Sequence, residues 1–522
     1  MGEKGRPQRR EDGKLERDLA DRLTEYAESG VYPYHMPGHK RNLPASDRIG
    51  QDAGRILTQT AKIDLTEIDG FDDLHAPEGV LAEAMEKAAR LYGADHCFYT
   101  VNGSTAGLLT AISAAVPRKG TLIMARNCHR SAYHGVYLRQ LTPVYLYPET
   151  TGEAGIAAAV TAQQVEEALC LHPEAEAVLI VSPTYDGLVA DVETIAEIVH
   201  AYGKPLIVDS AHGAHFGFHP AFPENAVRCG ADYTVVSLHK TMPCLTQTAL
   251  LLVNEKRADL QRVRLFERIY QTSSPSYVLM AAMDACMELV RERGSGLWDG
   301  FFADRAAFYR QTERLRFLRV VASDGMRKGQ EKGDVEAGLA QEPPLDAFCL
   351  DPCKILIHTA KSGLSGKALS DILREKYRLQ MEMAAGDYVT AIMTCCDTKE
   401  GWERLAAALL EIDASCKKGA GGSRERQPVY PQLETVLPLF DALDGRRETV
   451  PLETARGRVS ADFINLYPPG IPIVVPGERL EEAVIGLLRQ LLRQGLFLQG
   501  VNGEEIAVLA GADRFCRACP ME

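Results

Sequence analysis

The sequence predicts an α/β protein with a large domain on a mostly parallel sheet, a smaller α+β lobe and a C-terminal α+β domain. Two observations predict this fold class. Between about residues 80 and 255, short apolar runs alternate with amphipathic stretches, which is typical of a sheet covered by helices on both faces. Two polar, Gly-containing breaks, at residues 323–344 and 417–428, then divide the later chain into further units.

Seven apolar runs are expected to form the buried strands, because strands covered on both faces lose the alternation of polar and apolar residues. These runs are CFYTV (97–101), TLIMA (121–125), PVYLY (143–147), AVLIVS (177–182), PLIVD (205–209), YTVVS (233–237) and TALLLV (248–253). One helix is expected between Asp191, which can cap its first turn, and Gly203, which can end it. Its apolar residues recur at helical spacing at Ile195, Ile198, Val199 and Tyr202.

The polar breaks predict the division of the chain. We expect an N-terminal segment at residues 1–45, a large domain at 46–300, a small α+β lobe at 301–425 and a C-terminal domain at 426–522.

Composition narrows the classes of function. The 522 residues carry a formal net charge of −13, which argues against a nucleic-acid partner because phosphate binding needs clustered Lys and Arg. No apolar run approaches the roughly 20 residues of a membrane helix, and the charged N-terminus does not match a secretory signal. The 13 cysteines are therefore expected to be reduced thiols of a cytoplasmic protein. The C-x-x-C of Cys516 and Cys519 has no second pair and is interpreted as part of a frayed tail.

Four chemically distinctive segments each follow a predicted strand, and in open α/β sheets ligands gather beyond the carboxyl ends of the strands. The first segment is Asn102 to Gly107, which precedes an apolar helix. Its small residues, with the N–H groups of Gly103, Ser104 and Thr105 and two hydroxyls, can surround a phosphate. By itself this pattern is equally typical of an ordinary helix cap.

The second segment, which begins at Asp209, follows the run PLIVD. A carboxylate fixed there can pair with a protonated ring nitrogen, and the small Ala211 leaves room for a flat ring beside His212. A helix-capping aspartate is the simpler interpretation of the segment in isolation.

The third segment, Ser237 to Lys240, follows the run YTVVS. A lysine in an apolar environment has a lowered pKa and can attack an aldehyde, whereas Ser237 and His239 can donate to a phosphate. The alternative is a surface lysine whose ammonium reaches water. The fourth segment contains His129 after TLIMA, where an imidazole can stack on a planar ring or be a hydrogen-bonded core residue.

Together the four segments describe a pyridoxal-phosphate site, with Lys240 carrying the cofactor as a Schiff base. Their occurrence at four strand ends in this order makes a purely structural explanation of all four improbable.

The sequence also resembles the bacterial Orn/Lys/Arg decarboxylase family, which has the aspartate-aminotransferase type of pyridoxal-phosphate-dependent transferase fold. The matching segments are Tyr34 to Lys40 (YHMPGHK), Asp64 to Glu67, Asp72 to Gly79 (DDLHAPEG), Asn127 to His129, Ser182 to Gly187 (SPTYDG), Asp209 to His215 (DSAHGAH), Ser237 to Lys240, Tyr467 to Pro472 (YPPGIP) and Pro476 to Glu478. The resemblance covers nearly the whole chain apart from the charged N-terminus and the two polar breaks.

This resemblance implies roles that agree with the chemistry. Lys240 would be the Schiff-base lysine, Asp209 the partner of the pyridine nitrogen and His129 the stacking residue. Ser104, Thr105, Ser237 and His239 would hold the phosphate, and His212 would lie near the ring hydroxyl.

The resemblance also bears on assembly. Ser273, within Thr272 to Pro275, lies in a loop that resembles one reaching the phosphate of a neighbouring subunit, which implies a homodimer with shared sites. The chain begins almost at the YHMPGHK segment and is expected to lack the wing domain of longer members, so a dimer or tetramer is expected rather than a ring.

The implied reaction is decarboxylation of a basic amino acid (arginine, lysine or ornithine) to an amine and CO2. The substrate's distal cation needs an acidic partner. Glu67, Asp69, Asp72, Asp73 and Glu78 form one cluster of candidates, and Glu382 is a second candidate. For any one of the clustered acids, a solvated loop is an equally good interpretation.

Several alternatives remain at this stage. Lys240 and His239 are both candidates for the proton donor to Cα. An aminotransferase or a lyase would bind the cofactor with nearly the same residues, and a catalytically silent homologue is the alternative outside enzymes. No metal is expected, because His212 and His215 lie inside the cofactor motif without an obvious third ligand.

Overall fold

The computed structural model describes residues 18–30, 37, 60–150, 156–321, 349–359, 361–416, 430–467 and 470–511. The YHMPGHK segment apart from Pro37, Pro468 and Pro469 of the YPPGIP segment, and the C-x-x-C of Cys516 and Cys519 lie outside these ranges. Both polar breaks lie entirely outside them as well, so the domain limits stay a prediction.

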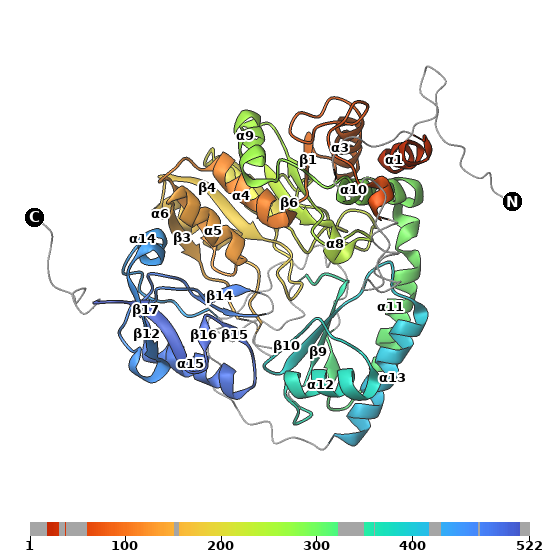
Figure 1. Ribbon diagram of the computed structural model, residues 1–522. Helices are drawn as coiled ribbons and strands as arrows, with labels where there is room; N and C mark the ends of the chain where they lie inside the picture. Colours follow the sequence, from red (N-terminus) through yellow and green to blue (C-terminus); the bar gives the residue numbers. More distant parts are fainter. Residues whose placement is uncertain are drawn as a thin grey trace, which may run out of the picture.

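The central sheet contains seven strands within the described ranges, in the order β1-β7-β6-β5-β4-β2-β3 (Figure 1). They are β1 His96–Thr100, β2 Thr121–Ala125, β3 Thr142–Leu146, β4 Ala175–Val181, β5 Leu206–Asp209, β6 Tyr233–Ser237 and β7 Ala249–Val253. Within the sheet, the neighbouring strands β3, β2, β4, β5 and β6 run parallel to one another, whereas β7 is antiparallel to both β6 and β1. The predicted strands and the mostly parallel sheet are confirmed, because every run forms a strand with ends displaced by at most two residues.

Helices cover both faces of this sheet, as the near-continuous burial of its strands requires. They include α3 Val80–Tyr92, α4 Gly103–Ala115, α5 Arg130–Arg139, α6 Ala162–Leu171, α7 Val192–Ala201, α8 Leu238–Thr241, α9 Leu260–Tyr270 and α10 Tyr277–Arg293. Strand β7 shows the two faces: Leu250 and Leu252 pack with α3 and α10, whereas Leu251 and Val253 pack with α4, α5 and α7. A short helix, α1 Leu19–Glu28, packs against α10.

The helix predicted after Asp191 is α7, and the Asp191 carboxylate accepts a hydrogen bond from the N–H of Thr194. Ile195 and Val199 are buried as predicted. Tyr202 is different, because it is the C-terminal cap residue and is 36% exposed. Helical spacing placed it on the apolar face, but the helix has ended at its position.

The small lobe has a four-stranded antiparallel sheet with the order β10-β11-β9-β8. Its strands are β8 Arg319–Val320, β9 Lys354–His358, β10 Met383–Ala385 and β11 Tyr388–Ile392, and its helices are α11 Asp299–Thr312, α12 Gly366–Tyr377 and α13 Lys399–Ser415. Trp298 and Trp402 are buried in a core that continues into the large domain through α10. The shared core fixes the small lobe against the large domain.

The C-terminal unit contains two small antiparallel sheets, β12-β17-β16 and β14-β13-β15. Its elements are α14 Leu439–Asp444, β12 Arg447–Pro451, β13 Ile464–Leu466, β14 Ile471–Val474, α15 Glu482–Arg493, β15 Leu498–Gln499, β16 Val501–Asn502 and β17 Glu505–Leu509. Val484, Ile485 and Leu488 of α15 are buried in a core of its own. The unit lies beside α5 and the β3 edge of the large domain (Figure 1).

Two expectations from composition can be compared with the described ranges. No helix within these ranges is long and apolar enough to cross a membrane. The cysteines in the same ranges form no disulfide.

Candidate active site

The segments predicted to meet do so at the carboxyl edge of the parallel strands. Asp209 is the last residue of β5, and Ser237 is the last residue of β6, directly before the single turn α8 that carries Lys240. His129 follows β2 and is the N-cap residue of α5. Because parallel strands end at the same edge, residues far apart in sequence face one space.

Lys240 is the central side chain of this edge. Its Nζ lies 3.1 Å from Nε2 of His212. Burial lowers the pKa of Lys240, and the negative charges of Asp209 and Glu382 oppose this effect. A buried amine with a lowered pKa is uncharged at lower pH than a surface lysine, and this makes it a better nucleophile.

Asp209 places a buried carboxylate beside Lys240. One of its oxygens, Oδ1, accepts a hydrogen bond of 3.1 Å from the N–H of Ala211. Burial raises the pKa of Asp209, whereas the positive charge of Lys240 and the Ala211 N–H oppose the rise. A cationic partner would therefore stabilise the charged form of this carboxylate.

His129 forms another wall. Its Nδ1 accepts hydrogen bonds from the N–H and the hydroxyl of Ser131, at 3.2 and 2.8 Å. Burial, reinforced by the charge of Lys240, lowers the pKa of His129 to about 4, so the imidazole is neutral near pH 7. A Cβ atom at Gly470 would lie 3.6 Å from Nε2 of His129, so the C-terminal unit contributes to this wall.

The predicted phosphate-binding residues lie at the start of α4 and around α8. Gly103, whose φ is +74°, begins α4, and Ser104 and Thr105 follow in its first turn. The hydroxyl of Ser237 is buried without a hydrogen-bond partner in the described structure. His239 donates from Nδ1 to the carbonyl of Thr248 at 3.0 Å, which leaves Nε2 available to a ligand.

The predicted acidic residues separate into two places. Glu382 lies at the site: its Oε1 accepts a 2.6 Å hydrogen bond from the hydroxyl of Tyr185, and its charge acts on Lys240. Asp72 caps α3, because its carboxylate accepts from the N–H groups of Gly79 and Leu81.

Glu67 and Asp73 lie near the start of α10. Burial, followed by the negative charges of Glu67, Asp72 and Asp73, raises the pKa of Tyr277 in the first turn of α10. Glu67 and Asp69 are exposed. Ser273 is exposed in the loop before α10, next to Thr272, whose carbonyl accepts a hydrogen bond from His75. The structure therefore places Glu67 and Asp73 near the start of α10, which follows the loop of Ser273, and Glu382 near Lys240.

Comparison with known proteins identifies the family. The model for the major domain of Orn/Lys/Arg decarboxylases matches residues 18–400, and the model for their C-terminal domain matches residues 434–502. The chain belongs to the Orn/Lys/Arg decarboxylase family. It is an amino-acid decarboxylase.

Individual relatives agree with this assignment. The chain is 31% identical to an arginine decarboxylase of Bacillus subtilis over 92% of this chain and 94% of the relative. It is 24% identical to a lysine decarboxylase of Pseudomonas aeruginosa over 90% of this chain and 74% of the relative. Lysine decarboxylase A from P. aeruginosa has the same fold, with a TM-score of 0.78 at 22% identity over 94% of this chain and 80% of that structure. The predicted fold class is confirmed.

The decarboxylase site also contains side chains to which the sequence analysis gave no role. Tyr185 lies edge-on to His212, with ring centroids 5.1 Å apart. Lys354, the first residue of β9, places Nζ 3.0 Å from Nδ1 of His212 and 5.0 Å from the Tyr185 ring centroid. The one signal for Lys354 in the sequence is its position at the start of the apolar run ILI.

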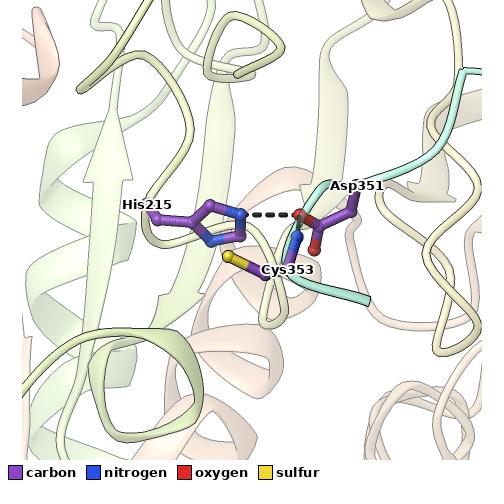
Figure 2. A group of neighbouring side chains, drawn as sticks. All are labelled: His215, Asp351 and Cys353. Atoms are coloured by element: carbon purple, nitrogen blue, oxygen red, sulfur yellow. Dashed lines mark hydrogen bonds and ion pairs between the residues drawn. The ribbon is translucent and has the colours of Figure 1, made fainter. Parts of the chain in front are cut away.

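A buried pair joins the two lobes of the decarboxylase beside this site. Nε2 of His215 lies 2.8 Å from Oδ1 of Asp351, and both side chains are fully buried. Figure 2 shows this contact, with Cys353 below the imidazole. Among the described residues, these three bring one possible ligand atom each within 4.8 Å of one another, but Nε2 of His215 and Oδ1 of Asp351 already bind each other. His212 does not join the group, because its ring nitrogens face the two lysines.

Gly187 controls how closely the turn containing Lys354 approaches the large domain. A Cβ atom at this glycine would lie 2.6 Å from Cγ of Lys354, and its φ is +97°. The N–H of Asp351 also donates to the Gly187 carbonyl at 2.7 Å. Only a residue without a side chain fits here.

Gly187→Ala is therefore expected to lower the free energy of unfolding by at least about 2 kcal/mol, from backbone strain and the clash with Lys354. Gly203→Ala is the matched control, because its φ is +71° and no atom lies within 4 Å of the added Cβ. In the control, the free energy of unfolding is expected to fall by about 1 kcal/mol, from backbone strain alone. The midpoints of thermal unfolding of the two variants are compared. Equal losses of stability would show that the clash with Lys354 does not contribute.

Proposed function

We propose that the protein is a pyridoxal-phosphate enzyme that decarboxylates a basic L-amino acid (arginine, lysine or ornithine) and releases the corresponding amine and CO2. The observation that carries the proposal is a buried lysine at a strand end, with Asp209 and His129 beside it and α4 beginning at the same edge. A lysine, a carboxylate and a helix N-terminus are the groups that this cofactor requires.

The side chains fit the cofactor in ways that do not depend on the family. Ser237 has a buried hydroxyl without a partner, and a phosphate oxygen would supply an acceptor for it. The first turn of α4 offers the N–H groups of Ser104 and Thr105 to the same anion. Asp209 would hold the proton of a ring nitrogen, and His129, as a neutral imidazole, can stack on a flat ring.

Bound pyridoxal phosphate supplies an electron sink for the bond that breaks at Cα. The chain's own groups do the remaining work. Lys240 would hold the cofactor through Nζ. Asp209 would keep the ring nitrogen charged, and His129 with Gly470 would exclude water from one face. Because a proton replaces the carboxylate at Cα, the site must also deliver one proton in each turnover.

Glu382 is the favoured partner for the distal cation of the substrate. It accepts a hydrogen bond from the Tyr185 hydroxyl, and it lies close enough to Lys240 for its negative charge to raise the pKa of that lysine. Glu67 and Asp73 are the second candidates, because their charges act on Tyr277, just after the loop of Ser273. If that loop reaches a neighbouring subunit, these acids would belong to the neighbour's site.

Glu382→Gln is expected to raise KM for the basic amino acid by about tenfold or more, because a charge-assisted hydrogen bond is lost, while the cofactor stays bound to Lys240. Glu375→Gln, an exposed change on α12 of the same lobe, is the control. Steady-state kinetics of both variants and of Glu67→Gln decide the assignment. If KM rises only in Glu67→Gln, the acids of the neighbouring subunit, and not Glu382, would bind the substrate's cation.

A second copy of the chain is the proposed partner. Leu265 and Ile269 lie one turn apart on α9, just before the loop of Ser273, and are 52% and 57% exposed. Exposed apolar residues beside a functional loop are typical of an interface. Sedimentation of the protein with bound cofactor would give the mass of a dimer or of a tetramer.

The decisive experiment for the proposed function is incubation of the purified protein and pyridoxal phosphate with arginine, lysine and ornithine in turn. Mass spectrometry of the products should show an amine that is one CO2 lighter than one of the three substrates. A keto acid product would instead support an aminotransferase on the same fold.

A further inference from the structure

Two buried amines meet at one imidazole. Lys354 is 2% exposed, and its Nζ lies 3.0 Å from Nδ1 of His212. Nζ of Lys240 lies 3.1 Å from the other ring nitrogen, Nε2. The chain Lys354–His212–Lys240 therefore begins on the small lobe and ends on the lysine proposed to bind the cofactor.

The protons of this chain can be counted. Burial is the largest cause that holds the pKa of His212 well below its usual value, so the ring is neutral. A neutral imidazole has one N–H and one lone pair. Consequently, one lysine must donate to the ring, and the other must accept from it through an uncharged amine.

Three carboxylates favour the charged form of Lys354, whereas two, Asp209 and Glu382, favour the charged form of Lys240. Besides Lys240, the groups that act on Lys354 are Asp351 on its own turn, Asp186 of the large domain and Glu382 from the start of β10, all three of them carboxylates. The face of the Tyr185 ring also lies beside the Lys354 amine. Burial lowers the pKa of Lys354 to about 8, which still leaves the amine protonated near pH 7.

The turn that carries Lys354 is fixed on both sides. Asp351 pairs with His215 of the large domain, and the same carboxylate oxygen accepts from the N–H of Cys353 at 2.9 Å (Figure 2). The N–H of Lys354 donates to the Asp351 carbonyl at 3.0 Å. The His215–Asp351 pair thus holds the Lys354 amine at the distance that His212 requires.

We propose that Lys354 is a positioning residue that controls the protonation of Lys240 through His212. Protonated Lys354 donates to Nδ1, so the Nε2–H of His212 is directed at the lone pair of Lys240 and keeps that amine uncharged. If Lys240 takes the Nε2 proton, Lys354 replaces it at Nδ1, and the ring changes tautomer without becoming charged. This inference rests on the proposed use of pyridoxal phosphate.

The test measures bond formation at Lys240 rather than turnover. Protein freed of cofactor is mixed with pyridoxal phosphate at a series of pH values, reduced with borohydride, and the labelled Lys240 peptide is quantified over time. Formation of the bond between Nζ and the aldehyde carbon, with loss of water, requires the uncharged amine. The pH midpoint of the rate therefore reports the charge on Lys240.

Lys354→Met is expected to raise this midpoint by about one pH unit and to slow capture at pH 7 by about tenfold, because Lys240 can then remain protonated. Lys354→Arg restores a charged donor and should return the midpoint toward the wild-type value. In a His212→Phe background, Lys354→Met should have no further effect on the midpoint. Lys87→Met, which removes another largely buried ammonium, is the control and should leave the midpoint unchanged.

The outcomes separate two failures. If wild-type protein never acquires a label on Lys240, the proposed function is wrong. If wild type is labelled but Lys354→Met has the same midpoint, the inference about Lys354 is overturned and the cofactor assignment stands. His212→Phe alone must also raise the midpoint, so an unchanged midpoint there would overturn the inference even if Lys354→Met did not fold.

Discussion

Lys240→Ala is expected to reduce turnover to about one ten-thousandth of the wild-type rate or below, because alanine has no amine to hold the cofactor or to carry a proton. The same variant should acquire no borohydride-stable label at this position. Both results follow from a buried Nζ at the end of β6, beside Asp209 and His212. Assays of amine release together with peptide mass spectrometry check them.

Lys256→Ala is the control for this experiment, since Lys256 is exposed after β7. It should retain wild-type turnover and label. Full activity of Lys240→Ala would contradict the assignment of the cofactor lysine. If activity is lost and another lysine is labelled, the cofactor assignment stands but the cofactor is attached to that other lysine.

Glu478→Gln is expected to destabilise the attachment of the C-terminal unit by about 3 kcal/mol, because it leaves a buried guanidinium without its counter-charge. Arg126 is fully buried beneath this unit, 3.2 Å from Glu478. It also donates to the carbonyls of Pro472 and Ile473, at 2.6 and 3.1 Å. These contacts attach β14 to the end of β2.

Hydrogen exchange of the β14 amides and the midpoint of thermal unfolding measure this effect. Glu453→Gln removes a 73% exposed partner of Arg489 and should change stability by at most about 0.5 kcal/mol. Turnover should fall in Glu478→Gln, because Gly470 next to β14 contacts the His129 edge, while the label on Lys240 persists. Equal exchange in both variants would show that the buried pair does not hold the unit in place.

The sequence predicted those parts of the site that depend on local pattern. Parallel strands covered on both faces appear as continuous apolar runs, and a residue directly after such a run lies at the carboxyl edge of the sheet. Asp209, His129 and Lys240 were placed in this way, and the structure brings them together. The family followed from the same motifs.

The predicted acidic residues show where local pattern stops being sufficient. Asp72 lies in an acidic segment and Glu382 between two methionines, and neither context shows which donor the carboxylate meets. In the structure Asp72 accepts from the N–H groups that begin α3, whereas Glu382 is directed to the site by Tyr185. Which carboxylate meets which donor depends on the packing of the small lobe on the large domain.

The sequence by itself therefore determined the sheet, the strand-end chemistry and the family of this decarboxylase. Only the tertiary structure decided that Lys354 shares the imidazole of His212 with Lys240, that His215 pairs with Asp351, and that Gly470 lies against His129. Hydrophobic periodicity records which side of an element is buried, but not which distant element covers it. Contacts between lobes form when those buried surfaces pack together, so they appear only in the folded chain.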